Sequence, residues 1–178
     1  MQHFRSLDEA SVQRAWITVG VFDGVHRGHQ EILRRLAEGA HAAGLPAAVL
    51  TFYPHPAVVL TGHPIRCLTT PDERAELLAG LGADIVVTEP FTHHLSAVPA
   101  AEFMRRVKEH LGLERLLIGY DFALGKGREG NAARLAEIGG SLGYSVEIVP
   151  GVSDESGVIS STTIRKLVAG GDVRDAAA

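Results

Sequence analysis

The sequence predicts an α/β domain, with a five-stranded, mostly parallel sheet and helices on both faces. Short apolar runs rich in β-branched residues alternate with amphipathic stretches of helical length, the order that gives a parallel sheet covered by helices. Gly44, Gly82, Gly112 and Gly143 each follow a helical stretch, where glycine best adopts the left-handed conformation that ends a helix. A chain of 178 residues, 46% of them hydrophobic, has room for one core but not for two full enzyme domains.

Five segments are the candidate strands. Each is short and mostly apolar, as strands buried on both faces are. In chain order they span residues 16–22, 46–52, 83–88, 115–120 and 145–149.

Five helices are expected between and after these strands. The stretch 29–43 places Ile32, Leu33, Leu36 and Ala40 on one face, which is the spacing of an amphipathic helix. Thr70 followed by Pro71 is a cap residue before a proline suited to the first helical turn. The remaining helices are expected over residues 71–80, 100–111, 131–142 and 161–169.

Composition excludes several classes of function. The net charge of −4 argues against a nucleic-acid partner, for which a basic face is expected. No stretch reaches the roughly 20 apolar residues of a membrane helix, and the first residues lack the order of a signal peptide. We therefore expect no membrane partner and a cytoplasmic location. The single cysteine, Cys67, can form no internal disulfide and is expected to be a structural thiol.

The strongest chemical signal lies where the first strand runs through a glycine-containing loop into a helix, over residues 20–29. This strand–loop–helix order binds phosphates in parallel α/β proteins. Gly24 and Gly28 allow a tight turn and close approach of a ligand, while free N–H groups at the helix start face an anion. His26 and His29 are three residues apart, close enough to point together at phosphate oxygens and to stabilise the charge of departing pyrophosphate.

Two other interpretations of these histidines compete. An isolated His-x-x-His is most often a pair of ordinary surface residues at a helix start, but the flanking glycines and the preceding strand favour a phosphate site here. Alternatively, His26, His29 and Asp23 supply three ligands to a zinc ion. A helix N-terminus favours anions and opposes cations, so the zinc site is the weaker hypothesis.

A second candidate phosphate site lies near the C-terminus. Ser160, Ser161 and Thr162 precede or open the last helix, and Arg165 follows one turn later. Hydroxyl groups and an arginine in this arrangement can grip a phosphate. Taken alone, such a run is most often only a helix cap.

Four sequence blocks together resemble a known family. GVFDGVHRGHQ, TFYPHP, GYDFALGKGREGN and ISSTTIR occur in this order, and the chain from about residue 16 to about 172 is similar to the FMN adenylyltransferase module of bacterial bifunctional FAD synthetases. The motif His-x-Gly-His alone indicates only the wider nucleotidylyltransferase superfamily. The combination of four blocks is far more selective.

The resemblance implies a Rossmann-like nucleotidylyltransferase fold and an enzyme that converts the substrates FMN and ATP to FAD and pyrophosphate with Mg²⁺. It implies in-line attack of the FMN phosphate on the α-phosphorus of ATP, without a general base. His26, His29 and Arg165 match the residues that act on the phosphates. The nucleotide- and substrate-binding positions are Gly20, Phe22, Asp23 and Gly24 around ATP, His55 near the phosphates and flavin, Asp121 after the fourth strand, and Ser160, Ser161 and Thr162 in the second phosphate block.

The sequence departs from the family pattern in three places. Tyr53 stands where the family usually has an acidic residue, which changes the polarity of that loop. Leu124 replaces a frequent aromatic residue, which removes a ring that could stack on a flavin or adenine. The family also continues into a riboflavin kinase barrel, which is expected to be absent here. We expect residues 1–178 to form a single FMN adenylyltransferase-like domain, either a stand-alone protein or an excised domain.

Two rival functions remain. Another nucleotidylyltransferase with a different phosphorylated acceptor shares the histidine motif and the fold. A non-catalytic flavin- or nucleotide-binding module is the second rival, with Tyr53 and Leu124 marking lost turnover. Residues 125–130 resemble a phosphate loop but lack P-loop spacing; they are expected to form a mobile turn, in which Lys126 and Arg128 are either solvated or near the substrate phosphate. The exposed pair His93 and His94 is assigned no role.

Overall fold

A computed structural model describes residues 1–154 and 157–177. Its main sheet has six strands in the order β1-β4-β3-β2-β5-β6, and every neighbouring pair is parallel. The strands are β1 (Gln2–Phe4), β2 (Ala15–Val19), β3 (Ala47–Tyr53), β4 (Ile85–Pro90), β5 (Leu113–Gly119) and β6 (Ser145–Val149). A two-stranded antiparallel ribbon, β7 (Ser153–Asp154) and β8 (Gly157–Val158), follows.

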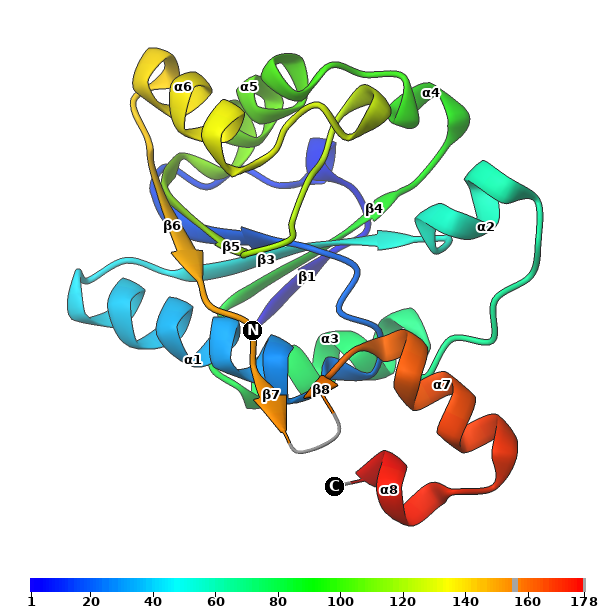
Figure 1. The fold of residues 1–178 in the computed structure, drawn as a ribbon. Coiled ribbons are helices and arrows are strands. Elements are labelled where there is room, and N and C mark those ends of the chain that lie inside the picture. The colour runs from blue at the N-terminus through cyan, green and yellow to red at the C-terminus, as the bar shows by residue number, and fades with distance from the viewer. Residues whose placement is uncertain (155–156, 178) are drawn as a thin grey trace.

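Helices cover both faces of this sheet (Figure 1). On one face lie α1 (Arg27–Ala42) and α3 (Pro71–Gly80), and on the other α5 (Ala100–Leu111) and α6 (Ala132–Leu142). Shorter helices are α2 (Pro56–Thr61) and α4 (His93–Ser96), and α7 (Ser161–Gly170) and α8 (Val173–Ala177) follow the ribbon. Within the described residues, no helix is long and apolar enough to cross a membrane.

The core is divided into two layers by the alternation of side chains along the strands. In β3, Ala48 and Leu50 pack in the layer beneath α5 and α6, whereas Ala47 and Val49 pack in the layer beneath α1 and α3. Successive side chains of a strand point to opposite faces of a sheet. Because both faces are covered, the strands carry continuous apolar runs, which is the pattern that identified them in the sequence.

The predicted α/β fold is confirmed, with one strand more than expected. The additional strand, β1, is a three-residue edge strand paired with β4. Four predicted strands are shifted at their ends and the fifth, β6, has the predicted bounds, as have α3 and α5. The left-handed glycines after the helices are confirmed, with φ of 68° at Gly44, 97° at Gly82, 58° at Gly112 and 74° at Gly143.

Local signals account for the start of α3. The Thr70 side chain accepts a hydrogen bond from the backbone of Glu73, and the Glu73 side chain accepts one from the backbone of Thr70. This reciprocal pair is a capping box, and Pro71 occupies the first turn. The predicted role of Thr70 and Pro71 is therefore confirmed.

The strand order places a ligand site at one edge of the sheet. The chain moves from β2 to β3 to β4 in one direction, then crosses to β5 and β6 on the other side of β2. In open α/β sheets the point where the order reverses leaves a crevice at the carboxyl ends of the strands. The loops after β2 and β5, with Gly20 and Asp121, meet at this crevice.

Candidate active site

The loop after β2 makes the tightest turn of the site. Phe22 and Gly24 adopt left-handed conformations with φ of 52° and 74°, and His26 is the residue before the first residue of α1. A side chain at Gly24 would meet the Leu68 side chain, and one at Gly20 would meet the ring of Phe22. Because α1 begins at Arg27 rather than at His29, His29 lies inside the first helical turn. The sequence placed that helix start two residues too late.

His26 and His29 are brought together. Their rings stack with centroids 3.6 Å apart and an interplanar angle of 24°, and the ring of Phe22 meets His29 edge-on at 5.0 Å. Nδ1 of each histidine is buried without a hydrogen-bond partner among the described residues, which leaves Nε2 of each ring for a ligand. The sequence-predicted convergence of the two imidazoles is present.

Burial keeps both imidazoles neutral. It lowers the pKa of His26, and it lowers the pKa of His29 to about 3. Repulsion between the two imidazoles if both were protonated, and the positive charge of Arg74, lower the pKa of His29 further. A neutral imidazole presents one N–H donor and one acceptor. A polyanion bound beside the rings would favour their protonated forms, since an opposite charge favours the charged form of a base.

Asp23 is buried in the loop and does not line the histidine cavity or the two other cavities described below. Its side chain is 1% exposed. One carboxylate oxygen accepts hydrogen bonds from the backbone N–H groups of Leu68 and Thr69 at 2.8 and 3.2 Å, and lies 3.7 Å from the Arg74 guanidinium. The other oxygen accepts one from Arg165 at 2.6 Å. The carboxylate is thus committed to protein groups, which disfavours the zinc hypothesis that used it as a ligand; the described residues hold no cluster of three metal-binding side chains.

The second predicted phosphate segment docks onto the same loop. Ser160 caps α7 by accepting a hydrogen bond from the Thr163 backbone, as expected for a hydroxyl run at a helix start. Ser161 donates a hydrogen bond to the Asp23 carbonyl oxygen at 2.8 Å, and Arg165 donates one to the Thr162 hydroxyl at 3.2 Å. Two segments far apart in the chain are therefore joined at Asp23.

A cavity of about 290 Å³ opens between the carboxyl ends of β2, β5 and β6. Its lining includes the two stacked histidines and Gly28 at the start of α1. Tyr120, Pro150 and Gly151 also line it, with the Tyr120 ring packed close against Gly151. The predicted site residues that line this cavity are Gly20, Phe22, His26, His29, Asp121 and Ser160.

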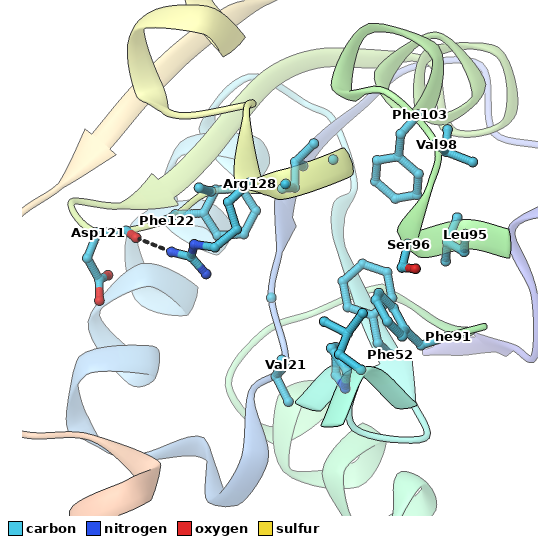
Figure 2. A pocket seen from close by; sticks show the side chains of 17 residues that line it. Val21, Phe52, Phe91, Leu95, Ser96, Val98, Phe103, Asp121, Phe122 and Arg128 are labelled. Atoms are coloured by element: carbon cyan, nitrogen blue, oxygen red, sulfur yellow. Dashed lines mark hydrogen bonds between the residues drawn. The ribbon is translucent and has the colours of Figure 1, made fainter. Parts of the chain in front are cut away.

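A larger cavity of about 520 Å³ adjoins it (Figure 2). Its wall is mostly apolar, and Figure 2 shows the rings of Phe52, Phe91 and Phe103 on one side and Phe122 on the other. Leu124, where the family often carries an aromatic residue, lies in this wall. The residues common to both cavities are Gly20, Val21, Asp121 and Phe122.

His55 lies apart from these two cavities. It precedes α2, where Nδ1 accepts a hydrogen bond from the Ala57 backbone at 3.1 Å. Its pKa is lowered by burial and by the positive charge of Arg165, so it is near the Asp23–Arg165 pair. Together with Tyr53 and Cys67 it lines a third cavity of about 420 Å³. Cys67 is exposed, in contrast to a structural thiol of the core.

Residues 8–163 match the family model of FAD synthetase. The chain belongs to the FAD synthetase family. Curated relatives named bifunctional riboflavin kinase/FMN adenylyltransferase include one from Listeria monocytogenes, 34% identical over 99% of this chain and 56% of the relative. Another, from Pseudomonas fluorescens, is 36% identical over 87% of this chain and 50% of the relative. The chain thus spans about half the length of these relatives.

A solved structure supports the fold of this family member. The crystal structure of a macrolide-efflux protein from Streptococcus pneumoniae superimposes with a TM-score of 0.87 at 28% identity, and the match covers 98% of this chain and 59% of that one. The predicted resemblance to FAD synthetases and the Rossmann-like fold are both confirmed.

Sequence reasoning missed one charged group beside this candidate site and the phenylalanines of the larger cavity. Arg74 is 1% exposed and donates hydrogen bonds to Thr51, Thr69 and the Phe52 carbonyl oxygen. Its sequence context, between acidic residues in a helix, is that of a surface residue. The four phenylalanines of this cavity come from four separate segments: β3, the loop after β4, α5 and the loop after β5.

Proposed function

We propose that this chain transfers the AMP group of ATP to FMN, giving FAD and pyrophosphate. The observation that carries the proposal is the pair of adjoining cavities, one with stacked histidines at a helix N-terminus and one walled by aromatic rings. A nucleotide and a flavin bound in them would meet at the shared wall of Gly20, Val21, Asp121 and Phe122. The match to the FAD synthetase family supports the same reaction.

The smaller cavity suits ATP. His26, Gly28 and His29, at the start of α1, line this cavity, so the helix N-terminus and the two imidazoles would bind the phosphates. Tyr120 and Gly151, which line the same cavity, would hold the adenine ring. Gly28 leaves room for the His26 ring, because a Cβ at this position would lie only 3.2 Å from it.

The larger cavity suits the isoalloxazine ring of FMN. A flat, mostly apolar ring system gains from burial against Phe52, Phe91 and Phe103, and from offset or edge contacts with their rings. Leu124 takes the place of one possible stacking partner. The three phenylalanines still supply aromatic surface, from β3, from the loop that follows β4 and from α5. The flavin phosphate would then point toward Asp121 and the nucleotide cavity.

The reaction needs positioning and charge stabilisation. An oxygen of the FMN phosphate attacks the α-phosphorus of ATP, a new P–O bond forms, and the bond from that phosphorus to the bridging oxygen of the β-phosphate breaks. The electron pair leaves with pyrophosphate, and no base is required because the FMN phosphate is already anionic. His26 and His29 stabilise the growing charge, and Arg165, Ser161 and Thr162 receive the departing pyrophosphate.

In this scheme Asp23 holds the Arg165 side chain in place and leaves some of its N–H donors for the substrate. It holds one guanidinium nitrogen at 2.6 Å, while a guanidinium has five N–H donors. Arg165 can therefore keep its bond to Asp23 and still present donors to a phosphate. The ion pair fixes the side chain before the substrate binds, which reduces the entropy lost on binding.

Mg²⁺ fits this site through the substrates more than through the protein. Asp121 is exposed between the two cavities and forms no ion pair among the described residues, so its carboxylate is available to a cation. Mg²⁺ is commonly held by one or two carboxylates and by substrate phosphates, and bound there it would neutralise phosphate charge. His26 and His29 make poorer ligands for it, because Mg²⁺ prefers oxygen.

The test is a direct assay with purified protein, FMN, ATP and Mg²⁺, with FAD and pyrophosphate measured by chromatography and a coupled assay. The proposal predicts both products in equal amounts and poor activity with CTP. Binding of FMN and ATP without products over hours would favour a non-catalytic binding module. A preference for CTP with a small phospho-alcohol would place the chain among the other nucleotidylyltransferases.

A further inference from the structure

The wall of the larger cavity, which is lined by Phe52, Phe91 and Phe103, contains one positively charged side chain. The residues that line this cavity all belong to the described part of the chain, and Arg128 is the sole basic residue among them. In Figure 2 its side chain extends from the segment after β5 toward Asp121, on the same side as Phe122 and opposite Phe52, Phe91 and Phe103. One guanidinium nitrogen donates a hydrogen bond to the Asp121 carbonyl oxygen at 3.3 Å.

The backbone around Arg128 is held in place. Arg128 has φ of 61°, a left-handed conformation that costs free energy in a residue other than glycine. Three links tie the segment to the start of α5 and to itself: Lys126 N–H donates to the Val98 carbonyl at 2.9 Å, the Glu129 carboxylate accepts from Ala100 N–H at 2.9 Å, and Leu124 pairs with Gly130. Residues 125–130 are thus a tethered turn and not a loosely attached one.

The charge of Arg128 has no ionic partner among the residues that the structure describes. By contrast, Arg134, only six positions along, pairs with Glu137. The Asp121 carbonyl oxygen accepts a hydrogen bond from one guanidinium nitrogen. A guanidinium carries five N–H donors, so others remain for a ligand. A tethered guanidinium that lies in the wall of the larger cavity, and that is bonded to a residue lining both cavities, is suited to an anion.

We propose that Arg128 binds the phosphate of FMN and thereby selects FMN over riboflavin. This inference rests on the proposed function. With the isoalloxazine ring among Phe52, Phe91 and Phe103, the phosphate must approach the wall shared with the nucleotide cavity in order to reach ATP, and that wall includes Asp121, which Arg128 contacts. The apolar surface cannot distinguish the two flavins, because they share the ring; the guanidinium interacts with the phosphate that only FMN carries.

Arg128 is a binding and positioning group in this scheme, with no covalent step of its own. Two donors on one planar group fix both the place and the orientation of a phosphate. That orientation matters because in-line attack needs a phosphate oxygen directed at the α-phosphorus. Lys126, the neighbouring cation on the same turn, does not line the cavity, so it supplies a matched control.

The experiment measures equilibrium binding of FMN and of riboflavin, separately, by quenching of flavin fluorescence without ATP. The variants are Arg128→Gln and Arg128→Lys, with Lys126→Gln as the control. Glutamine keeps an N–H donor for the Asp121 carbonyl and removes the charge, so the turn is retained. We expect Arg128→Gln to weaken FMN binding by about 10- to 100-fold, the range of hydrogen bonds to a charged group, and to leave riboflavin binding unchanged.

Arg128→Lys should recover part of the preference for FMN, and Lys126→Gln should bind both flavins as the unaltered protein does. An unchanged ratio of FMN to riboflavin affinity in Arg128→Gln would overturn the proposal, as would equal loss of both flavins, which would mark Arg128 as a support of the turn. FAD formation by the unaltered protein is assayed in parallel. Absence of FAD with an Arg128-dependent FMN preference would refute the proposed function alone, whereas FAD formation without that preference would refute this inference alone.

Discussion

Arg165 donates a hydrogen bond to the Asp23 carboxylate at 2.6 Å, joining two residues that are 142 positions apart in the chain. The second oxygen of the same carboxylate lies 3.7 Å from the buried guanidinium of Arg74. Three elements, the loop after β2, α3 and α7, therefore share one buried negative charge. Such a charge is favourable only while its partners remain in place.

Asp23→Asn should destabilise the fold strongly. The substitution keeps the shape of the side chain but removes the negative charge that compensates Arg74. It also replaces one accepting oxygen by an N–H₂ donor, which then faces the donors of an arginine or of the loop backbone. Loss of one partner of a buried ion pair costs about 3–5 kcal/mol. Urea unfolding of the two proteins at pH 7 measures the difference in free energy.

A suitable control for this experiment is Asp72→Asn. Asp72 pairs with Arg5 at 2.5 Å, but the side chains are 65% and 56% exposed, and exposed pairs contribute about 0–1 kcal/mol. Equal effects of Asp23→Asn and Asp72→Asn would contradict the interpretation that burial makes the Asp23 cluster important.

The local parts of this structure were accessible from the sequence. Apolar runs identified the strands of the sheet interior because those strands are buried on both faces, and the cap at Thr70 and the glycines after the helices gave element ends. The three residues of β1 gave no such signal. Their structure depends on pairing with β4, some 80 positions away in the chain, and a short edge strand has no local pattern of its own.

The candidate site likewise contains features that local sequence predicts and features that depend on contacts between distant segments. The stacked histidines follow from three-residue spacing beside a helix start, which is local geometry. The interior position of Asp23 does not, because a carboxylate in a glycine-containing loop has the pattern of a ligand group until α7 docks against it. Arg74 likewise becomes a buried cation only through contacts with β3 and the segment before α3.

Gly24→Ala should destabilise more than Gly62→Ala. Both glycines have positive φ, 74° and 71°, so each substitution incurs the left-handed penalty of about 1–2 kcal/mol. A Cβ at Gly62 meets open space, but one at Gly24 would lie 2.5 Å from Leu68 Cδ1 and 3.1 Å from Leu68 Cβ. Leu68 must then move, and its N–H is a donor to Asp23. Urea midpoints of the two variants test this order, and a larger loss for Gly62→Ala would contradict it.

The buried His29 should make stability fall in acid. Its pKa is about 3 in the folded protein against an ordinary value of 6.5, so between these values the unfolded chain binds a proton that the folded protein does not. The free energy of unfolding therefore decreases as pH falls below about 6.5, by at most about 1.4 kcal/mol per pH unit from this group. Denaturant titrations at about pH 5.0, 5.5, 6.0 and 7.0 measure how the free energy of unfolding changes with pH in this range.

The variant His29→Gln removes this contribution, since glutamine does not titrate. Its unfolding free energy should depend less on pH over the same range, and the difference between the two proteins isolates His29 from carboxylates that titrate below pH 5. Parallel curves for the two proteins would show that the imidazole of His29 protonates without penalty in the folded state.

The last prediction concerns turnover by His29→Ala. His29 lies in the first turn of α1, with Nδ1 buried and its ring stacked on His26 at 3.6 Å, so Nε2 is the nitrogen that reaches a phosphate. Removing it deletes a donor that acts most strongly as charge builds on pyrophosphate. By comparison with removal of an oxyanion donor, kcat for FAD formation should fall about 100-fold, roughly 3 kcal/mol, while FMN affinity changes far less.

His94→Ala, which alters an exposed histidine of α4, should retain full activity. Unfolding curves accompany both assays, because a fall in kcat that follows a loss of folded protein has a different cause. A folded His29→Ala protein with kcat within a few-fold of the original would remove His29 from the phosphate site and leave His26 and the α1 N-terminus to stabilise the leaving group.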